Sequence, residues 1–244
     1  MSARYAGPMK FKAVIFDLFG TLVNDFGSSG AAIHMRDMAS ALGIPHEPFA
    51  QLWAQTINMR IDGAFDSVVA NIKHVCDAMN ADPRPEQIAA AVEIRMHYVR
   101  QALQPKSNAI DTLARLKTRA YRTGLLSNCS IEIPLLWHET AFANLIDAPV
   151  FSARVRLKKP DPRIFHLACE RLGFPAASCL YIADGEDHEL TAALKIGLHP
   201  VLFRPRPELP NRKTHEETKN WRGATISNLL EVLEILENRE RLPE

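Results

Sequence analysis

The stretch AVIFDLFGTL, residues 13–22, decides the expected fold. Ala13–Phe16 is an apolar run without polar alternation, which is typical of a strand buried on both faces of a parallel sheet. Asp17 follows the run directly and is expected at the carboxyl end of that strand, where doubly wound sheets hold their ligands. A carboxylate on rigid backbone can act as a nucleophile, whereas the simpler interpretation of Asp17 alone is a turn or helix-capping residue.

Four more short apolar runs follow along the chain, at residues 124–126, 149–151, 179–182 and 200–203. The amphipathic stretches 108–119 and 161–172 separate them and are expected to be helices. Strand, helix and strand in succession predict an α/β fold with a doubly wound parallel sheet. Residues 204–219 are rich in proline and polar side chains and predict a loop, and residues 226–236 predict a closing amphipathic helix.

One long segment of the chain contains no stretch that predicts a strand. Between residues 28 and 103 the pattern favours four helices, at residues 31–42, 47–58, 64–79 and 85–103. A single crossover of this length would be unusual, although one continuous α/β domain with long crossovers is the alternative. The sequence therefore predicts an all-helical cap domain, residues 25–103, inserted into an α/β core that comprises residues 1–24 and 104–244.

Composition narrows the classes of function. The 244 residues are 47% apolar and 23% charged with a formal net charge of +1, so no broad electrostatic field indicates a nucleic-acid or membrane partner. No apolar run approaches the roughly 18 residues that a membrane span requires, and the N-terminal residues lack the apolar core of a signal peptide. The four cysteines form no CxxC pair. We expect a cytoplasmic protein that acts on a small molecule; the sequence does not predict its oligomeric state.

Two further polar motifs follow apolar runs. In LLSN, residues 125–128, Ser127 and Asn128 could bind a phosphoryl or carboxylate oxygen, or could simply form a turn. In KKPDP, residues 158–162, the two prolines stiffen the approach to a helix. A lysine on such a lead-in can present a fixed positive charge to an anion, and Lys159 is the candidate, because Lys158 is expected to be solvated.

A fourth motif is acidic. In YIADGEDHE, residues 181–189, four carboxylates lie within six residues just after an apolar run. Like charges so close repel one another, and a hard cation would relieve the repulsion. Asp184 is the best candidate ligand because it comes first after the run, and Asp187 and Glu189 could assist through water or by orienting the ligands. The alternative is an acidic helix N-terminus that the helix dipole favours.

The set of four motifs, in the order FDLFGTL, LLSN, KKPDP and IADGEDHELTAALKIGL, resembles the haloacid dehalogenase (HAD) superfamily. The inserted helical segment resembles the cap of one of its subgroups. This resemblance implies a Rossmann-like core, a bound Mg²⁺ and hydrolysis of a phosphate monoester through an aspartyl-phosphate. The implied roles are Asp17 as nucleophile, Ser127 and Asn128 as contacts to the substrate anion, Lys159 as the charge-stabilising lysine, and Asp17, Asp184 and the backbone carbonyl of Phe19 as metal ligands.

The sequence departs from the family pattern at Phe19. Phosphatases of the family usually carry a second Asp there, which protonates the leaving group and then activates water. General acid–base catalysis contributes roughly 10²–10⁴-fold, so its loss predicts a slow enzyme, a preference for good leaving groups, or an acid borrowed from the cap. The cap histidines are His34, His74 and His97.

Two other functions remain open. A 2-haloacid dehalogenase of the same superfamily also has an aromatic residue at this position; its Asp attacks carbon and needs no metal. That chemistry requires a cap arginine for the substrate carboxylate, and Arg36 and Arg60 are the candidates. Loss of the acid is also compatible with a non-catalytic sensor of a phosphorylated ligand. The acidic motif around Asp184 favours the phosphatase.

Overall fold

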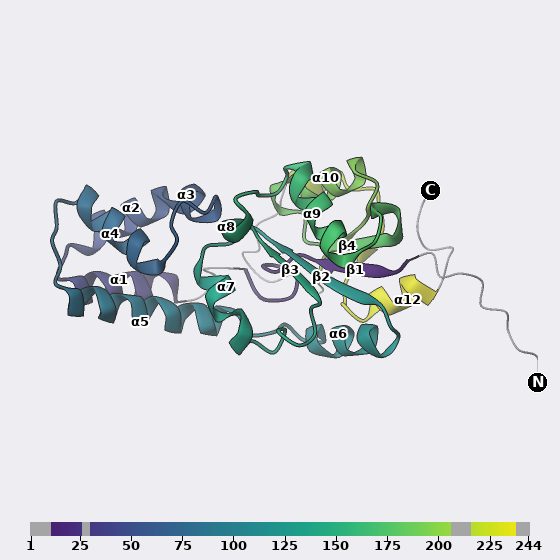
Figure 1. Ribbon diagram of the computed structural model, residues 1–244, viewed down its shortest axis with the longest axis horizontal. Coiled ribbons are helices and arrows are strands. Elements are labelled where there is room, and N and C mark those ends of the chain that lie inside the picture. The colour runs from purple at the N-terminus through teal and green to yellow at the C-terminus, as the bar shows by residue number, and fades with distance from the viewer. Residues whose placement is uncertain (1–10, 26–29, 206–215, 238–244) are drawn as a thin grey trace, which may run out of the picture.

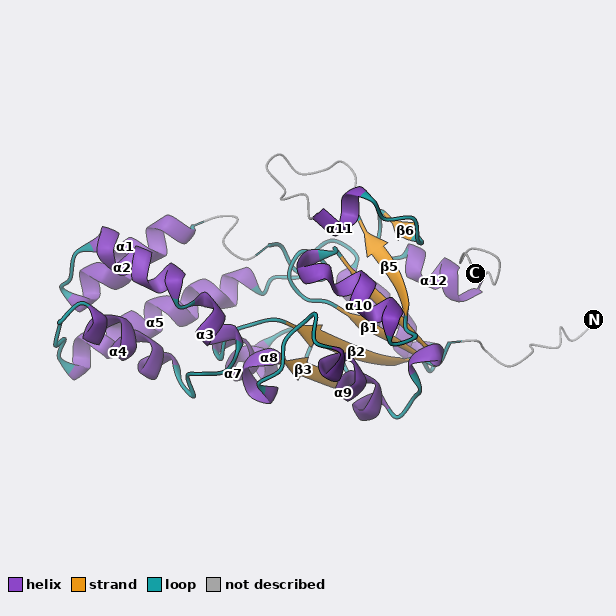
Figure 2. Cartoon of the chain, turned by 90° about the horizontal axis from the view of Figure 1, so that it is seen from above, coloured by secondary structure: helices purple, strands orange, loops and turns teal. Residues whose placement is uncertain are grey.

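The computed structural model describes residues 11–25, 30–205 and 216–237. Its centre is a six-stranded parallel sheet in the order β3-β2-β1-β4-β5-β6 (Figures 1 and 2). The order reverses beside β1, where a doubly wound sheet opens its ligand-binding crevice. The strands are β1 (Ala13–Phe16), β2 (Arg122–Ser127), β3 (Ala148–Phe151), β4 (Cys179–Ala183), β5 (His199–Phe203) and β6 (Thr225–Ile226). The predicted fold class is confirmed.

The register of the three central strands brings their carboxyl ends together. Phe16 of β1 lies opposite Leu125 of β2 on one side and Ile182 of β4 on the other. The ladder continues one residue further, because the backbone N–H of Asp17 donates to the carbonyl of Ile182 at 2.9 Å. The polar residues that follow these strands therefore meet at one edge of the sheet.

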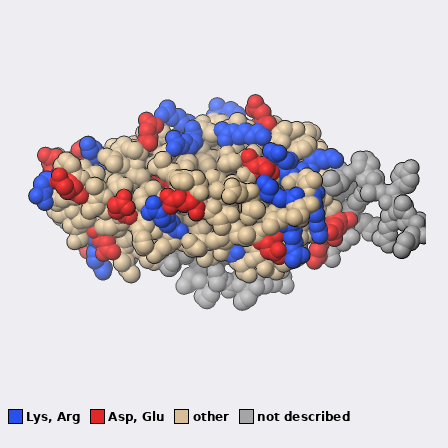
Figure 3. Space-filling view, turned by 60° about the horizontal axis from the view of Figure 1, so that its bottom comes forward, with Lys and Arg blue, Asp and Glu red and all other residues tan. Residues whose placement is uncertain are grey.

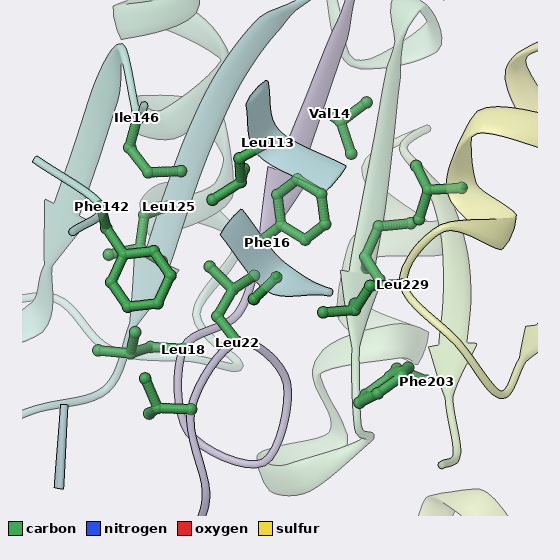
Figure 4. Packing of buried hydrophobic residues seen from close by; sticks show 14 of the residues in the cluster. Val14, Phe16, Leu18, Leu22, Leu113, Leu125, Phe142, Ile146, Phe203 and Leu229 are labelled. Carbon is green, nitrogen blue, oxygen red and sulfur yellow. The ribbon is translucent and has the colours of Figure 1, made fainter. Parts of the chain in front are cut away.

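Helices cover both faces of the sheet, and each face has its own apolar core. α6 (Ala109–Thr118) and α12 (Glu231–Glu237) pack on one face, whose core contains Val14, Phe16 and Leu113 (Figure 4). α9 (Pro162–Leu172) and α10 (Glu189–Lys195) pack on the other. The central strands have a nearly continuous apolar sequence because helices bury them on both faces. No helix in the described part of the chain is long and apolar enough to span a bilayer.

The described segment 30–103, between β1 and β2, consists of helices joined by short loops. It contains α1 (Ala31–Leu42), α2 (His46–Gln55), α3 (Ile57–Ile61), α4 (Val68–Ala78) and α5 (Pro85–Ala102). These helices bury a third apolar core of their own, which includes Met38, Phe49 and Ile72. The bundle lies beyond the carboxyl ends of the strands (Figure 1). The domain boundaries at residues 24/25 and 103/104 stay predictions.

Several predicted elements differ from the observed ones. The helix expected at residues 47–58 ends at Gln55, and α3 begins separately after Thr56. The helix expected from residue 64 begins at Val68, where the Ser67 side chain accepts from the N–H of Ala70 and caps it. Shorter helices that the sequence did not predict are α7 (Glu132–Leu136), α8 (Ser152–Val155), η1 (Trp137–Glu139), η2 (Ala176–Ser178) and η3 (Glu186–His188).

The C-terminal part also differs from expectation. Part of the loop predicted at residues 204–219 is helical, α11 (Glu216–Lys219), and residues 206–215 lie outside the described residues. Ile226, expected in the closing helix, belongs to β6 and pairs with Phe203. The helix begins at Glu231, whose carboxylate accepts from Ser227 and Asn228 and so satisfies backbone N–H groups ahead of the first turn.

Candidate active site

The structure brings the predicted nucleophile, lysine and acidic motif into one buried cluster. Asp17 follows β1, Asp184 follows β4, and Lys159 lies in the loop that leads into α9. All three are at most 4% exposed. Buried charges are costly unless they are paired, so this cluster is either a polar network that stabilises itself or a binding site.

Lys159 connects the carboxylates of the cluster. Its Nζ donates to Oδ1 of Asp17 at 2.6 Å and to Oε2 of Glu189 at 2.6 Å. Burial opposes the charged form of Lys159, but the two carboxylates outweigh it and raise the pKa of the ammonium well above its ordinary value. Lys159 therefore remains a cation and fixes one positive charge beside Asp17.

Asn128 holds the backbone of Lys159 in place. Its Oδ1 accepts from the backbone N–H of Lys159 at 2.8 Å, and its Nδ2 donates to the carbonyl of Lys159 at 3.1 Å. The same Nδ2 donates to Asp187 at 2.7 Å. The side-chain amide predicted to contact the substrate thus positions the lysine, and its contact with a substrate anion stays a prediction.

Glu189 and Tyr181 complete the buried cluster; the sequence predicted only a metal-assisting role for Glu189 and none for Tyr181. Oε2 of Glu189 accepts from Lys159 and from the Tyr181 hydroxyl, the latter at 2.6 Å, and Oε1 accepts from the backbone N–H of Gly185 at 3.1 Å. Burial raises the pKa of Glu189 well above its ordinary value, although Lys159 counteracts this effect. Glu189 was expected only as an assistant to the metal; in the structure it is the second partner of Lys159.

Asp17 keeps one oxygen available for chemistry. Oδ1 is bound to Lys159, whereas Oδ2 is buried and has no hydrogen-bond partner among the described residues. Burial raises the pKa of the Asp17 carboxyl, Lys159 lowers it, and the negative charge of Asp184 raises it further. A carboxylate with one oxygen anchored and the other free is oriented for nucleophilic attack.

The acidic residues of the cluster fit a hard cation. Asp17, Asp184 and Glu189 each offer an oxygen, and the three oxygens lie within 4.8 Å of one another. Gly20 makes this approach possible: its φ is +79°, and a Cβ there would lie 2.1 Å from Oδ2 of Asp184. Oxygen ligands of this kind suit Mg²⁺. Asp17 and Asp184 are the better ligands, because Glu189 already accepts three hydrogen bonds; a contribution from the Phe19 carbonyl stays a prediction.

Two buried hydroxyls belong to the segments that end β2 and follow β1. Ser127 is the last residue of β2 and Thr21 follows Gly20, and both are fully buried. Neither hydroxyl oxygen has a hydrogen-bond partner among the described residues, although the Cys129 thiol is near Ser127. Buried hydroxyls without partners are uncommon, and Ser127 was already predicted to bind the substrate anion.

The candidates in the helical segment have other partners. His34 stacks on Tyr98 with ring centroids 3.8 Å apart, and His97 contacts Gln101. His74 lies against Phe65, with ring centroids 5.2 Å apart. None of these histidines has a hydrogen bond to the cluster within the described part of the chain. Phe19 is half-buried and packs against the apolar core.

Of the two arginines considered for a substrate carboxylate, Arg36 is exposed and Arg60 is buried. Arg60 donates to the backbone carbonyl of Trp53 and to the Thr56 hydroxyl, both at 2.5 Å. Its guanidinium carbon lies 4.7 Å from the centre of the Trp53 ring. Within the described residues, neither arginine has a hydrogen bond to Asp17 or Lys159.

The fold and the site define a class: a doubly wound α/β protein with a carboxylate–lysine–carboxylate cluster at the carboxyl edge of its sheet. The model of one family, the haloacid dehalogenase-like hydrolases, matches residues 11–197. The chain belongs to this family, as the order of its motifs predicts.

Curated relatives include both phosphatases and dehalogenases. The chain is 26% identical over 185 residues to Phosphatase MT3486 of Mycobacterium tuberculosis, with 73% of this chain and 81% of that protein covered. It is 32% identical over 132 residues to an (S)-2-haloacid dehalogenase of Pseudomonas fluorescens, at coverages of 49% and 56%. It is also 30% identical over 110 residues to the Rhythmically expressed gene 2 protein of Drosophila melanogaster. This match covers 42% of this chain and 42% of that protein.

Solved structures share the whole fold. A 2-haloacid dehalogenase from Pseudomonas syringae pv. Tomato DC3000 superposes with a TM-score of 0.68 at 20% identity, and a HAD phosphatase from Thermococcus onnurineus with 0.62 at 21%. Each comparison covers 93% of this chain and 98% of the other. The same architecture therefore supports both chemistries, and the fold does not choose between them.

Proposed function

We propose that this chain is a magnesium-dependent phosphatase that hydrolyses a small phosphate monoester through an aspartyl-phosphate on Asp17. The observation that carries the proposal is the close approach of two buried carboxylates, Asp17 and Asp184, next to one fixed cation, Lys159. Attack on carbon requires one carboxylate, whereas a second carboxylate at this distance is useful when a divalent cation must be held beside it.

In the proposed mechanism each residue of the cluster has a separate role. Oδ2 of Asp17 attacks phosphorus in line with the bond to the leaving oxygen, and that bond breaks as the O–P bond to Asp17 forms. Lys159 stabilises the negative charge on the phosphoryl oxygens from a fixed position that Asn128 and Glu189 maintain. Ser127 offers its hydroxyl to the same oxygens. Mg²⁺, held by Asp17 and Asp184, would offset the repulsion between the carboxylate and the phosphate dianion.

The direct test is release of inorganic phosphate from 4-nitrophenyl phosphate with and without Mg²⁺. We expect release that requires Mg²⁺, is abolished by EDTA and returns when Mg²⁺ is added back. The Asp17→Asn variant is the blank, because the amide keeps the size of the side chain but is a poor nucleophile. Release that is independent of Mg²⁺, or that persists in Asp17→Asn, would contradict the proposal.

A 2-haloacid dehalogenase is the second candidate. Phe19 favours it, because displacement of a halide needs no general acid for the leaving group, and one of the relatives above is named as such an enzyme. In that case halide would be released from 2-chloropropionate without added metal, and phosphate esters would be inert. A protein that binds phosphate esters equally well as Asp17→Asn, and turns over neither class of substrate, would be the sensor that the sequence left open.

A small-molecule substrate and a cytoplasmic location belong to the same proposal. Acidic and basic side chains are mixed over the face of the molecule shown in Figure 3. The four cysteines are buried and free, as expected in a reducing compartment. The cluster at the carboxyl edge of the sheet is nearly closed to solvent, which suits a small substrate better than a polymer.

A further inference from the structure

Asp25 is a carboxylate next to the candidate active site that sequence reasoning did not single out. A Cβ on Gly20 would lie 2.1 Å from Oδ2 of Asp184 and 2.8 Å from Oδ1 of Asp25. The two carboxylates therefore approach the same point, and only the absence of a side chain at Gly20 leaves room for both. The loop that carries Asp25 is anchored two residues earlier, because Val23 forms a β-bridge with Pro105.

Asp25 is available for proton transfer, in contrast to its neighbours. It is exposed and forms no hydrogen bond or ion pair within the described residues. Asp17 and Glu189 are both bound to Lys159, and Asp187 is bound to a side-chain amide. Among these four carboxylates, Asp25 is the one that has neither oxygen bound to a partner within the described residues.

The position of Asp25 suits an acid rather than a fourth ligand of the same cation. The group of oxygens that lie within 4.8 Å of one another comprises Asp17, Asp184 and Glu189, and Asp25 does not join it. In an in-line displacement the nucleophile and the leaving oxygen stand on opposite sides of phosphorus. The acid that serves the leaving oxygen must accordingly be displaced from the nucleophile, toward the solvent side of the site.

We propose that Asp25 is the general acid and base of the reaction, in place of the carboxylate that Phe19 cannot provide. This inference rests on the proposed phosphatase function. In the first step the protonated Asp25 gives its proton to the leaving oxygen as the P–O bond breaks, and the alcohol departs. In the second step the Asp25 carboxylate takes a proton from water, the water oxygen bonds to phosphorus, and the bond to Asp17 breaks to release phosphate and the free Asp17 carboxylate.

The test compares the wild type with Asp25→Asn on two esters that differ in leaving group, 4-nitrophenyl phosphate and phenyl phosphate. Nitrophenolate leaves without a proton, whereas phenolate is a poorer leaving group and benefits from one. We expect Asp25→Asn to lower kcat/KM for phenyl phosphate by about 10²-fold or more, and that for 4-nitrophenyl phosphate by much less. Because the second step lacks its base, the variant should also release a burst of about one nitrophenolate per enzyme before slow turnover.

The control variant is Asn24→Ala, which changes the exposed neighbour of Asp25 and should leave both esters and the absence of a burst unchanged. Equal losses on the two esters, no loss on either, or a higher Mg²⁺ requirement with an unchanged ratio between the esters would overturn the role of Asp25 while leaving the phosphatase intact. If the wild type releases no phosphate from either ester, or Asp17→Asn releases as much, the proposed function itself fails and this role fails with it.

Discussion

Lys158 and Lys159 are adjacent in the sequence but have opposite surroundings. The Lys158 side chain is 36% exposed and pairs with Asp62 at the surface, at 2.8 Å. The Lys159 side chain is 3% exposed and pairs with Asp17 and Glu189. A surface ion pair of this kind contributes little to the stability of the fold. A buried cation beside a carboxylate can stabilise negative charge that develops there during a reaction.

The contrast gives a prediction with its own control. Lys159→Gln should lower kcat on an aryl phosphate by about 10²–10³-fold, because it removes the positive charge that faces the phosphoryl oxygens. Lys158→Gln should change kcat less than about twofold, because Lys158 pairs with Asp62 at the surface and, within the described residues, has no hydrogen bond to Asp17 or Glu189. Steady-state kinetics on the two purified variants measure both values of kcat. A comparable fall of kcat in both variants would show that Lys159 has no special role.

The sequence predicts some of the site residues and misses others for a physical reason. Asp17 and Asp184 each follow an apolar run, so a parallel sheet must bring them to one edge. Tyr181 lies inside such a run, and the pattern therefore predicts a core residue. Only the structure shows that its hydroxyl donates to Glu189. The position of Asp25 near Asp184 depends on the path of a loop, which short-range sequence patterns do not specify.

At the scale of elements, one buried ion pair joins the helical segment to the core. Arg95 of α5 donates to Glu132 of α7 at 2.6 Å, and both side chains are at most 3% exposed. Burial disfavours the charged carboxylate, but Arg95 counteracts it and holds the pKa of Glu132 below its ordinary value. The same helix α5 makes a second contact through Arg100 and Glu139 at 2.8 Å, with side chains 44% and 39% exposed.

These two pairs predict unequal effects on stability. Glu132→Ala removes the carboxylate that faces the buried Arg95 charge and should lower the free energy of unfolding by about 3–5 kcal/mol. Glu139→Ala removes an exposed pair on the same helix and should cost less than about 1 kcal/mol. Urea unfolding followed by circular dichroism measures both; similar losses for the two variants would mean that burial of the pair does not matter.

The stacked His34 predicts a dependence of stability on pH. Its Nε2 lies 3.2 Å from Nη1 of Arg95 and can accept a hydrogen bond only while the ring is neutral. Burial and the charge of Arg95 lower the pKa of His34 to about 4. In the unfolded chain the His34 ring takes up a proton near pH 6.5. The contribution of neutral His34 to the free energy of unfolding is therefore present above pH 6.5 and is lost as the pH falls toward 4.

The size of this effect follows from the two pKa values. Between pH 7.5 and pH 5 the wild type should lose about 2 kcal/mol of unfolding free energy through His34. His34→Phe keeps a ring against Tyr98 but cannot titrate, so its stability should fall by about that much less over the same range. Parallel urea titrations of both proteins at the two pH values give the difference; identical pH dependence would remove His34 as the cause.

One residue that the sequence misplaced lies where a long-range contact overrides local periodicity. Ile226 continues the spacing of an amphipathic helix, but pairing with Phe203 on the sheet edge draws it into β6. Long, strongly periodic stretches such as α1 and α9 were predicted at nearly their observed bounds. Local pattern therefore sufficed for these two helices and failed at the end of the sheet.

At the scale of the whole molecule, the two chain crossings between the core and the helical segment lie side by side. Val23, on the way out, forms a bridge with Pro105, on the way back, and the N–H of Lys106 donates to the carbonyl of Leu22 at 2.8 Å. The Lys106 ammonium also donates to the Gly20 carbonyl. The loop between Asp17 and Asp25 is thus hydrogen-bonded to the return crossing from the helical segment.

In the proposed reaction Asp17, at the end of β1, becomes phosphorylated. The most direct measurement is an acid quench during turnover of 4-nitrophenyl phosphate with Mg²⁺, followed by borohydride reduction and peptide mass spectrometry. A phosphorylated Asp17 is reduced to homoserine, whereas a free carboxylate is not. The account predicts homoserine at position 17 only when both ester and Mg²⁺ are present; steady release of phosphate with Asp17 unmodified would contradict it.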